Sequence, residues 1–305
     1  MKELWVEKYR PKKIDGYVFR DEAQKKQVQT WIKDASIPHL LFSGSAGIGK
    51  TTMAKMLVNE LGVEDYDVLE INASRTNSVE DVRDKVVNFV QTIPFGPFKV
   101  VLLDEADYLS PNAQAALRGV MEEYHSTARF ILTCNYPNRI IPALHSRCQG
   151  FHIEKVDQVE FTARMATVLV TEGVEFDLYT LDTYVKATYP DLRKCLNMCQ
   201  MNSTDNKLAN VHGDEGGSQD WKLGAVDLFK AGRINEARKL MCQSVRPEEM
   251  EEVFRWMYDN LELWSTEPEK QDQAIVIIRQ GLVNHSFVAD PEINLSATLV
   301  ELAGV

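Results

Sequence analysis

Short apolar runs alternate with segments of helical periodicity along the first half of the chain. The expected strands cover residues 40–42, 68–72, 99–103, 129–135 and 151–153. The expected helices around them cover residues 21–34, 52–61, 81–90 and 112–123. Strands that alternate with helices predict an α/β domain with a parallel sheet and flanking helices. In such a sheet the functional residues gather at the carboxyl edge of the strands.

After residue 157 the pattern indicates helices alone. Three helices are expected at residues 158–172, 178–189 and 191–202, and five more at 221–231, 234–244, 247–262, 267–284 and 291–303. The polar, glycine-rich stretch between the two groups is typical of a linker. We therefore expect an α/β domain at residues 1–154, a helical domain at 155–204, a linker at 205–219 and an all-helical domain at 220–305.

The first expected strand leads into a glycine-rich loop, Gly44-Ser45-Ala46-Gly47-Ile48-Gly49-Lys50-Thr51. Glycines allow the backbone to curl so that successive N–H groups and the positive end of the next helix face one anion. Lys50 adds a positive charge for the β- and γ-phosphates, and the Thr51 hydroxyl suits Mg²⁺. A chance glycine-rich turn is the alternative, but a strand before the loop and a helix after it are the context that a phosphate-binding loop needs.

The third expected strand ends in acidic residues, Asp104-Glu105-Ala106-Asp107. At the end of a strand, Asp104 is suited to hold the Mg²⁺ shell, and Glu105 beside it to orient and activate an attacking water. The next expected strand also ends in a polar residue, Asn135. A solvated acidic turn is the alternative, and the phosphate-binding loop upstream argues against it. Together the two motifs predict hydrolysis of a nucleoside triphosphate.

The net charge of −11 is unevenly distributed along the chain. Residues 1–202 contain 24 Lys and Arg against 27 Asp and Glu, whereas residues 203–305 contain 10 against 18. A nearly neutral first part can still present a local basic face. The overall acidity therefore does not exclude contact with DNA.

Cysteine usage and hydropathy bear on where the protein works. The five cysteines are scattered and form no Cys-x-x-Cys pair, which favours reduced, buried thiols over disulfides or a zinc site. No apolar run approaches the ~20 residues that a membrane helix needs, and the first residues do not resemble a signal peptide. We expect a soluble, intracellular protein without a membrane partner, cytoplasmic, or located in the nucleus or host cytoplasm if its source is eukaryotic or viral.

Seven motifs stand in the order found in one protein family. They are Trp5-Val6-Glu7-Lys8-Tyr9-Arg10-Pro11, the phosphate-binding loop, Asp104-Glu105-Ala106-Asp107, Gln114-x-x-Leu117-Arg118-x-x-Met121-Glu122, Thr133-Cys134-Asn135-Tyr136, Ser146-Arg147-Cys148 and Asp191-Leu192-Arg193-x-x-Leu196-Asn197. Over residues 3–202 the chain resembles the small ATPase subunit of sliding-clamp loaders, that is, replication factor C small subunits and the equivalent subunit of T-even-type phages, within the AAA+ superfamily. The resemblance implies an AAA+ nucleotide-binding domain, a helical lid domain and an all-helical collar domain for oligomerisation.

The resemblance also implies a role for each motif. The adenine pocket would be lined by Val6, Glu7, Lys8, Tyr9, Arg10 and Val18. ATP phosphates would be held by Gly47, Ile48, Gly49, Lys50, Thr51 and Thr52, with Mg²⁺ on Thr51 and Asp104. Asn135 is similar to the sensor that positions the lytic water, and Arg193 to the lid residue that touches the γ-phosphate of the same subunit.

Arg147 is similar to an arginine finger, which would reach the ATP of a neighbouring subunit. If it acts in this way, only an assembled ring can hydrolyse ATP well. The alternatives are an ordinary surface ion pair for Arg147 and a helix salt bridge for Arg193. The loop sequence Gly-Ser-Ala-Gly, where a proline pair is usual in replication factor C, favours the phage or another viral branch.

The partners implied by the resemblance are a sliding clamp, primer–template DNA, several copies of this chain with a distinct subunit and, indirectly, a DNA polymerase. DNA would be gripped through its phosphates by helix N-termini and basic side chains, without base readout. The candidates are Arg75, Ser78, Arg83, Lys85 and Ser110. For each of them a solvated surface residue is an equally good interpretation.

The expected function follows from these roles. ATP binding would assemble a spiral that holds the clamp open, and hydrolysis on primer–template DNA would release the closed clamp for processive replication. Two alternatives stay open: another AAA+ DNA-dependent ATPase, such as a helicase, and a ring subunit that does not hydrolyse ATP. The Ser146-Arg147-Cys148 triplet argues against the first, and the full set of nucleotide-site residues argues against the second.

Overall fold

The structure, a computed structural model, describes residues 3–75, 79–153, 155–209, 221–245, 249–285 and 287–304. These residues belong to two compact units. The first unit contains residues up to Phe161 together with Asp191–Arg193, and the second contains Thr162–Pro190 and the chain from Lys194 onward. The short segment Asp191–Arg193 therefore belongs to the α/β unit, although the residues before and after it belong to the second unit.

The first unit is built on a five-stranded parallel sheet. Its strands are β1 (Leu40–Ser43), β2 (Val68–Asn72), β3 (Lys99–Asp104), β4 (Ala128–Cys134) and β5 (Gln149–His152). Their order across the sheet is β2-β3-β4-β1-β5, and every neighbouring pair is parallel. The predicted α/β fold is confirmed. The last strand begins at Gln149 rather than residue 151, because Gln149 already pairs with Leu40 at the start of β1.

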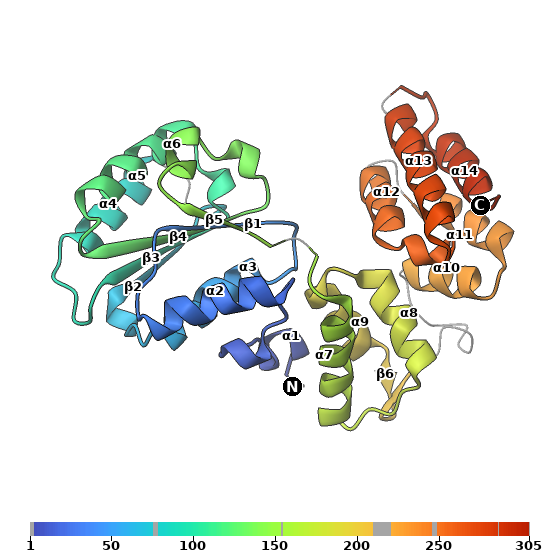
Figure 1. Cartoon of the computed structure of the whole chain (residues 1–305), viewed down its shortest axis with the longest axis horizontal. Helices are drawn as coiled ribbons and strands as arrows, with labels where there is room; N and C mark the ends of the chain where they lie inside the picture. Colours follow the sequence, from blue (N-terminus) through green and yellow to red (C-terminus); the bar gives the residue numbers. More distant parts are fainter. Residues whose placement is uncertain are drawn as a thin grey trace. The chain divides into compact units, whose positions relative to one another are not determined.

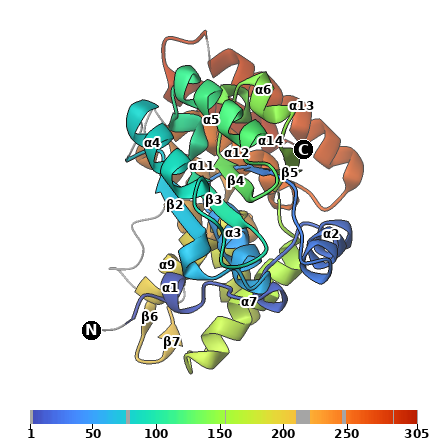
Figure 2. The ribbon, with the colours of Figure 1, turned by 90° about the vertical axis from the view of Figure 1, so that its left-hand side faces the viewer.

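Helices cover both faces of this sheet. They are α1 (Trp5–Lys8), α2 (Glu22–Lys33), α3 (Lys50–Glu60), α4 (Val79–Val90), α5 (Pro111–Glu123) and α6 (Pro142–His145). Helices α2 and α3 pack on one face, and α4 and α5 pack on the other (Figure 1). The paired strands β2 and β3 run side by side in both views (Figure 2).

The central strands β1, β3 and β4 are largely apolar because both of their faces are covered. Val101 and Leu103 of β3 belong to the core beneath α4 and α5, whereas Val100 and Leu102 belong to the core against α2 and α3. Successive strand residues point to opposite faces, so a sheet covered on both sides needs continuous apolar runs. This requirement explains the apolar runs of the three central strands, whereas the edge strands β2 and β5 include exposed polar residues.

The second unit is helical. It contains α7 (Gln158–Thr171) from Thr162 onward, α8 (Leu178–Thr188), most of α9 (Leu192–Met201), α10 (Trp221–Lys230), α11 (Ile234–Ser244), α12 (Met250–Asp259), α13 (Pro268–His285) and α14 (Pro291–Leu302). A short 3-10 turn at Leu261–Leu263 replaces the end of the helix expected at 247–262. Among the described residues, no helix is both long and apolar enough to cross a membrane.

A two-stranded hairpin follows α9, where the sequence predicted only helix and linker. Strand β6 (Ser203–Thr204) pairs antiparallel with β7 (Lys207–Leu208). The two residues of its turn, Asp205 and Asn206, have φ angles of 50° and 59°. Short polar residues tolerate this conformation, which two-residue hairpin turns require. The later part of the predicted linker, residues 210–219, lies outside the described residues.

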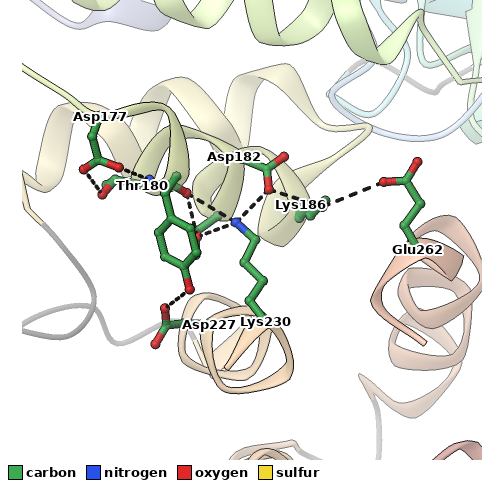
Figure 3. A network of polar contacts seen from close by, with 9 residues as sticks. Asp177, Thr180, Asp182, Lys186, Asp227, Lys230 and Glu262 are labelled. Atoms are coloured by element: carbon green, nitrogen blue, oxygen red, sulfur yellow. Dashed lines mark hydrogen bonds and ion pairs between the residues drawn. The ribbon is translucent and has the colours of Figure 1, made fainter. Parts of the chain in front are cut away.

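Polar contacts tie α8 to α10 within the second unit (Figure 3). The Lys230 ammonium of α10 lies 2.6 Å from the Asp182 carboxylate of α8 and donates to the Thr183 hydroxyl at 2.9 Å. In the opposite direction, the Tyr179 hydroxyl of α8 donates to the carboxylate of Asp227 at 3.0 Å. These contacts connect the helix that precedes the Asp191–Arg193 segment with the first helix after the predicted linker.

Candidate nucleotide-binding site

The loop between β1 and α3 depends on its glycines. Gly44, Gly47 and Gly49 have φ angles of +149°, +75° and +94°, which L-residues rarely adopt. A Cβ atom on Gly44 would lie 1.9 Å from the Ile153 carbonyl oxygen, and one on Gly47 would lie 1.9 Å from a carboxylate oxygen of Asp191. The loop conformation and the closeness of its neighbours therefore both exclude larger residues.

Lys50 begins α3 and is buried, with 8% of its surface exposed. Its ammonium group donates to the carbonyl oxygens of Gly44 at 2.9 Å and Ser45 at 2.6 Å. Burial lowers the pKa of Lys50, and the carboxylates of Asp104 and Asp107 oppose this shift. A buried cation whose hydrogen bonds go to neutral carbonyl groups is well prepared for an anion, because the anion would restore part of the solvation that burial removed.

Asp104 connects the loop to two strand ends. One of its oxygens, Oδ1, accepts a hydrogen bond from the Thr51 hydroxyl and another from the Thr133 hydroxyl, both at 2.7 Å. Thr133 in turn accepts a hydrogen bond from the backbone N–H of Glu105 at 3.0 Å. The Thr133 hydroxyl thus holds Asp104, the last residue of β3, and Glu105, the residue after it.

Glu105 adopts a left-handed backbone conformation with φ 58° and ψ 44°. This conformation costs a non-glycine residue about 1–2 kcal/mol, so the surrounding structure must hold it. The hydrogen bond from its N–H to Thr133 is one such restraint. The result is that the chain turns sharply after Asp104 and that Glu105 faces the pocket beside the loop.

The predicted catalytic and phosphate-binding residues gather around this pocket, with two exceptions. Its lining includes Gly47, Gly49, Lys50, Thr51, Thr52, Asp104, Glu105, Asn135 and Arg193. The first exception is Ile48, which is 3% exposed and packs in the core. The pocket is also lined by three residues that the sequence analysis did not assign, Ala46, Thr133 and Cys134. The sequence could have pointed to Thr133 through its position, since it lies two residues before Asn135 at the same end of β4.

The second exception is Arg147, which lies at the opposite edge of the sheet. It precedes β5 and lines a separate hollow with residues that come before β1 or lie at the start of β4, among them His39 and Arg129. Each strand residue adds about 3.3 Å, so the four residues of β1 alone span about 13 Å between the two edges. Its guanidinium group is ion-paired with Glu122 and donates to the Ala143 carbonyl at 2.9 Å. The ion pair considered as an alternative for Arg147 is therefore present in the single chain.

The residues predicted to surround adenine lie near the start of the chain. Val6, Glu7, Lys8, Tyr9 and Arg10 belong to α1 and the turn after it, and they do not line the pocket beside the loop. Val18 is half-buried and follows Tyr17, whose hydroxyl donates to the Gly49 carbonyl at 3.4 Å. The adenine assignment stays a prediction.

The DNA candidates are distributed over two helix starts. Arg75 is exposed after β2, and Arg83 and Lys85 are exposed on α4. Ser110 caps α5, and its hydroxyl accepts a hydrogen bond from the Ala113 N–H at 3.2 Å. Ser78 lies outside the described residues. Because α4 and α5 follow β2 and β3, both helices begin at the carboxyl edge of the sheet with their positive ends.

Replacing Thr133 with valine is expected to lower the kcat of ATP hydrolysis while ATP affinity changes little. Valine keeps the shape of threonine but removes the hydroxyl that bonds Asp104 and the Glu105 N–H. Hydrogen bonds to charged groups contribute about 1.5–3 kcal/mol, which corresponds to a loss of about 10- to 100-fold in rate. Steady-state ATPase assays and titration with a fluorescent ATP analogue would measure both quantities. Thr133→Ser keeps the hydroxyl and should remain active; equal loss in both variants would contradict the explanation.

The sheet, the glycine-rich loop and the polar strand ends define an ATPase domain of the AAA class. The sequence model described as "ATPase family associated with various cellular activities (AAA)" matches residues 40–155. Among solved structures, a RuvB variant of Thermotoga maritima aligns with 82% of this chain and 90% of that chain, with a TM-score of 0.57 and 15% identity. At this identity the likeness shows the fold alone.

Relatives identify the particular family. A replication factor C small subunit of Staphylothermus marinus is 35% identical over 311 residues, which cover 98% of this chain and 94% of that protein. The protein of the same name from Sulfurisphaera tokodaii is 42% identical over 209 residues, which cover 67% of this chain and 64% of that protein. The chain therefore belongs to the replication factor C small-subunit family, the clamp-loader family that its motifs resemble, and it is an ATPase.

Proposed function

We propose that this chain is the motor subunit of a sliding-clamp loader and that its ATP sites are completed between neighbouring copies. The observation that carries this proposal is the separation of Arg147 from the nucleotide pocket of its own chain. An arginine at one edge of the sheet and a pocket at the other edge suit a head-to-tail arrangement, in which each copy supplies Arg147 to the next. A closed ring or an open spiral follows from such an interface.

The pocket suits a magnesium nucleotide. The Thr51 hydroxyl oxygen and the Asp104 carboxylate oxygen lie 2.7 Å apart, and oxygen donors of this kind are the ligands that Mg²⁺ prefers. When bound there, Mg²⁺ would neutralise part of the negative charge on the phosphates. Lys50 and the N–H groups of the loop would bind the phosphates themselves. These residues support ATP with Mg²⁺ as the substrate.

Three further residues of the pocket have roles in hydrolysis under this proposal. Glu105 would orient and activate the attacking water, and Asn135 would hold that water in line with the γ-phosphate. Arg193 would contact the γ-phosphate from the segment that packs with the first unit. Binding of ATP would thereby fix the position of this segment and assemble the spiral that holds the clamp open. Hydrolysis on primer–template DNA would release the closed clamp.

The proposal is tested by steady-state ATPase measurements on the purified chain with candidate partner subunits from its own source. The assay is run with clamp alone, with primer–template DNA alone and with both. Stimulation that requires clamp and primed DNA together is the expected result. A high rate from the chain alone, indifferent to the clamp, would instead favour another class of AAA+ enzyme. No turnover in the complete assembly would favour a ring subunit without hydrolysis.

Contact with DNA is proposed at the start of α4 and α5. Replacing both Arg83 and Lys85 with alanine is expected to weaken binding of primer–template DNA and to reduce the slope of log affinity against log salt by about 1–2, because each side chain would neutralise one phosphate. DNA binding by the loader is measured by fluorescence anisotropy at several salt concentrations. Lys26→Ala is the control, since Lys26 is exposed on α2 over the other face of the sheet. An unchanged salt slope in the double variant would exclude α4 from the DNA surface.

A further inference from the structure

Asp107 is a buried carboxylate close to the nucleotide pocket, and the sequence analysis gave it no role. It lies in the 3-10 turn after β3, and 5% of its surface is exposed. Its Oδ2 accepts hydrogen bonds from the backbone N–H groups of Asn135 at 3.3 Å and Tyr136 at 3.2 Å. These are the first two residues after β4, and they stand 28 and 29 residues further along the chain. Asp107 therefore connects the turn after β3 to the end of β4.

The place of these contacts matters because the ladder of the sheet ends there. The pairing of β4 with β3 stops at Leu132, and the pairing of β4 with β1 stops at Cys134. Beyond that point the N–H groups of Asn135 and Tyr136 are not paired with a neighbouring strand in the described part of the chain. The Asp107 carboxylate accepts their hydrogen bonds instead. A side chain is only as well placed as the backbone that carries it, so Asp107 restrains the direction in which Asn135 leaves the strand.

A carboxylate is a costly means of accepting two backbone N–H groups. The second oxygen of Asp107, Oδ1, is buried and has no hydrogen-bond partner among the described residues. Burying a charge with one oxygen unpaired destabilises the folded protein, so a gain in stability does not explain why an aspartate stands at this position. The two N–H groups that Asp107 accepts belong to Asn135 and the residue after it, and Asn135 lines the pocket.

We propose that Asp107 is a positioning residue for ATP hydrolysis, which holds Asn135 at the place where the attacking water must lie. The inference rests on the proposed function, because it assumes that Asn135 positions this water. Asp107 itself is not among the residues that line the pocket. Its loss should therefore reduce the rate of the chemical step and leave ATP binding almost unchanged.

The chain offers a matched control in Asp67. This aspartate is also buried, with none of its surface exposed, and its Oδ2 also accepts a backbone N–H, that of Gly96 at 2.7 Å. Its Oδ1 likewise has no partner among the described residues. Asp67 precedes β2 and so lies at the amino edge of the sheet, away from the pocket. Removal of either carboxylate is expected to lower stability, but only the loss of Asp107 is expected to affect hydrolysis.

The test uses the full chain assembled with its partner subunits, clamp and primed DNA. Asp107→Ala is expected to lower kcat about tenfold or more, with the Kd of a fluorescent ATP analogue within about threefold of the wild type. Asp107→Asn keeps an oxygen that can accept both N–H groups and should restore kcat to within about threefold. In protein labelled with ¹⁵N-asparagine, the Asn135 amide should exchange with solvent faster in Asp107→Ala than in the wild type or in Asp107→Asn.

Several results would overturn the inference. One is a kcat of Asp107→Ala within about threefold of the wild type, and another is an equal loss of kcat in Asp67→Ala. If Asp107→Ala does not fold, Asp107→Glu decides: it keeps the charge, moves the carboxylate by one methylene group and should also lower kcat. Undiminished turnover in Asp107→Glu would contradict the positioning role. Asn135→Ala separates the two proposals, because its full activity would refute the role of Asn135 itself, whatever Asp107 does.

Discussion

Replacing Lys50 with alanine is expected to abolish ATP-dependent clamp loading and to lower kcat/KM for ATP by at least about 10²–10³-fold. Lys50 is a buried cation of the pocket, and in this structure its ammonium group donates hydrogen bonds to the carbonyl oxygens of Gly44 and Ser45. Bound phosphate would exchange these neutral partners for a negative charge. Without the ammonium group, the charge that develops on the phosphates during hydrolysis loses its fixed counterpart.

The same helix provides the control for this variant. Lys55 lies further along α3, is about two-fifths exposed and pairs with Glu70 at 2.7 Å. An exposed ion pair of this kind contributes only about 0–1 kcal/mol to stability, so Lys55→Ala should hydrolyse ATP normally. ATP hydrolysis, nucleotide binding and clamp loading are measured for both variants. Clamp loading retained by Lys50→Ala would refute the assignment of the phosphate-binding loop.

Replacing Arg147 with alanine is expected to leave ATP binding in its own subunit intact and to reduce hydrolysis at the neighbour's site. Arginine fingers supplied by a partner contribute about 10³–10⁵ in rate, which makes this the largest single effect that we expect on kcat. In the single chain, the Arg147 guanidinium is paired with Glu122, which Arg118 also approaches at 3.6 Å. Because these side chains are partly exposed, exchanging Glu122 for a phosphate costs little.

Mixed assemblies distinguish action between subunits from action within one subunit. If wild-type chains are combined with chains that carry Arg147→Ala, rates should fall in proportion to the number of sites that receive the variant residue. Combining Arg147→Ala chains with Lys50→Ala chains should restore some sites, since each chain lacks a different half. Arg20→Ala is the control, because Arg20 is an exposed arginine paired with Asp21. Undiminished turnover in an all-variant assembly would remove Arg147 from the mechanism.

The local features of the nucleotide site could be predicted because they depend on short stretches of sequence. The left-handed φ angles in the loop need glycine, the helix that begins at Lys50 follows directly, and the buried strands need continuous apolar runs. The carboxyl ends of parallel strands meet at one edge, which is why Asp104 and Asn135 were expected near each other. The hairpin turn at Asp205 and Asn206 was equally local, and it was missed because strands of two residues carry almost no periodic signal.

The sequence by itself determined the class of fold and the family, and it predicted which residues would bind the phosphates. Only the tertiary structure decided that Arg147 lies at the opposite edge from the pocket, that Asp191 packs against Gly47, and that Asp107 holds the end of β4. The physical reason is that these relations join residues far apart in the chain. Periodicity and spacing report which side chains share a helix face or a strand, whereas the partner of a buried carboxylate depends on strand order and on where each strand ends.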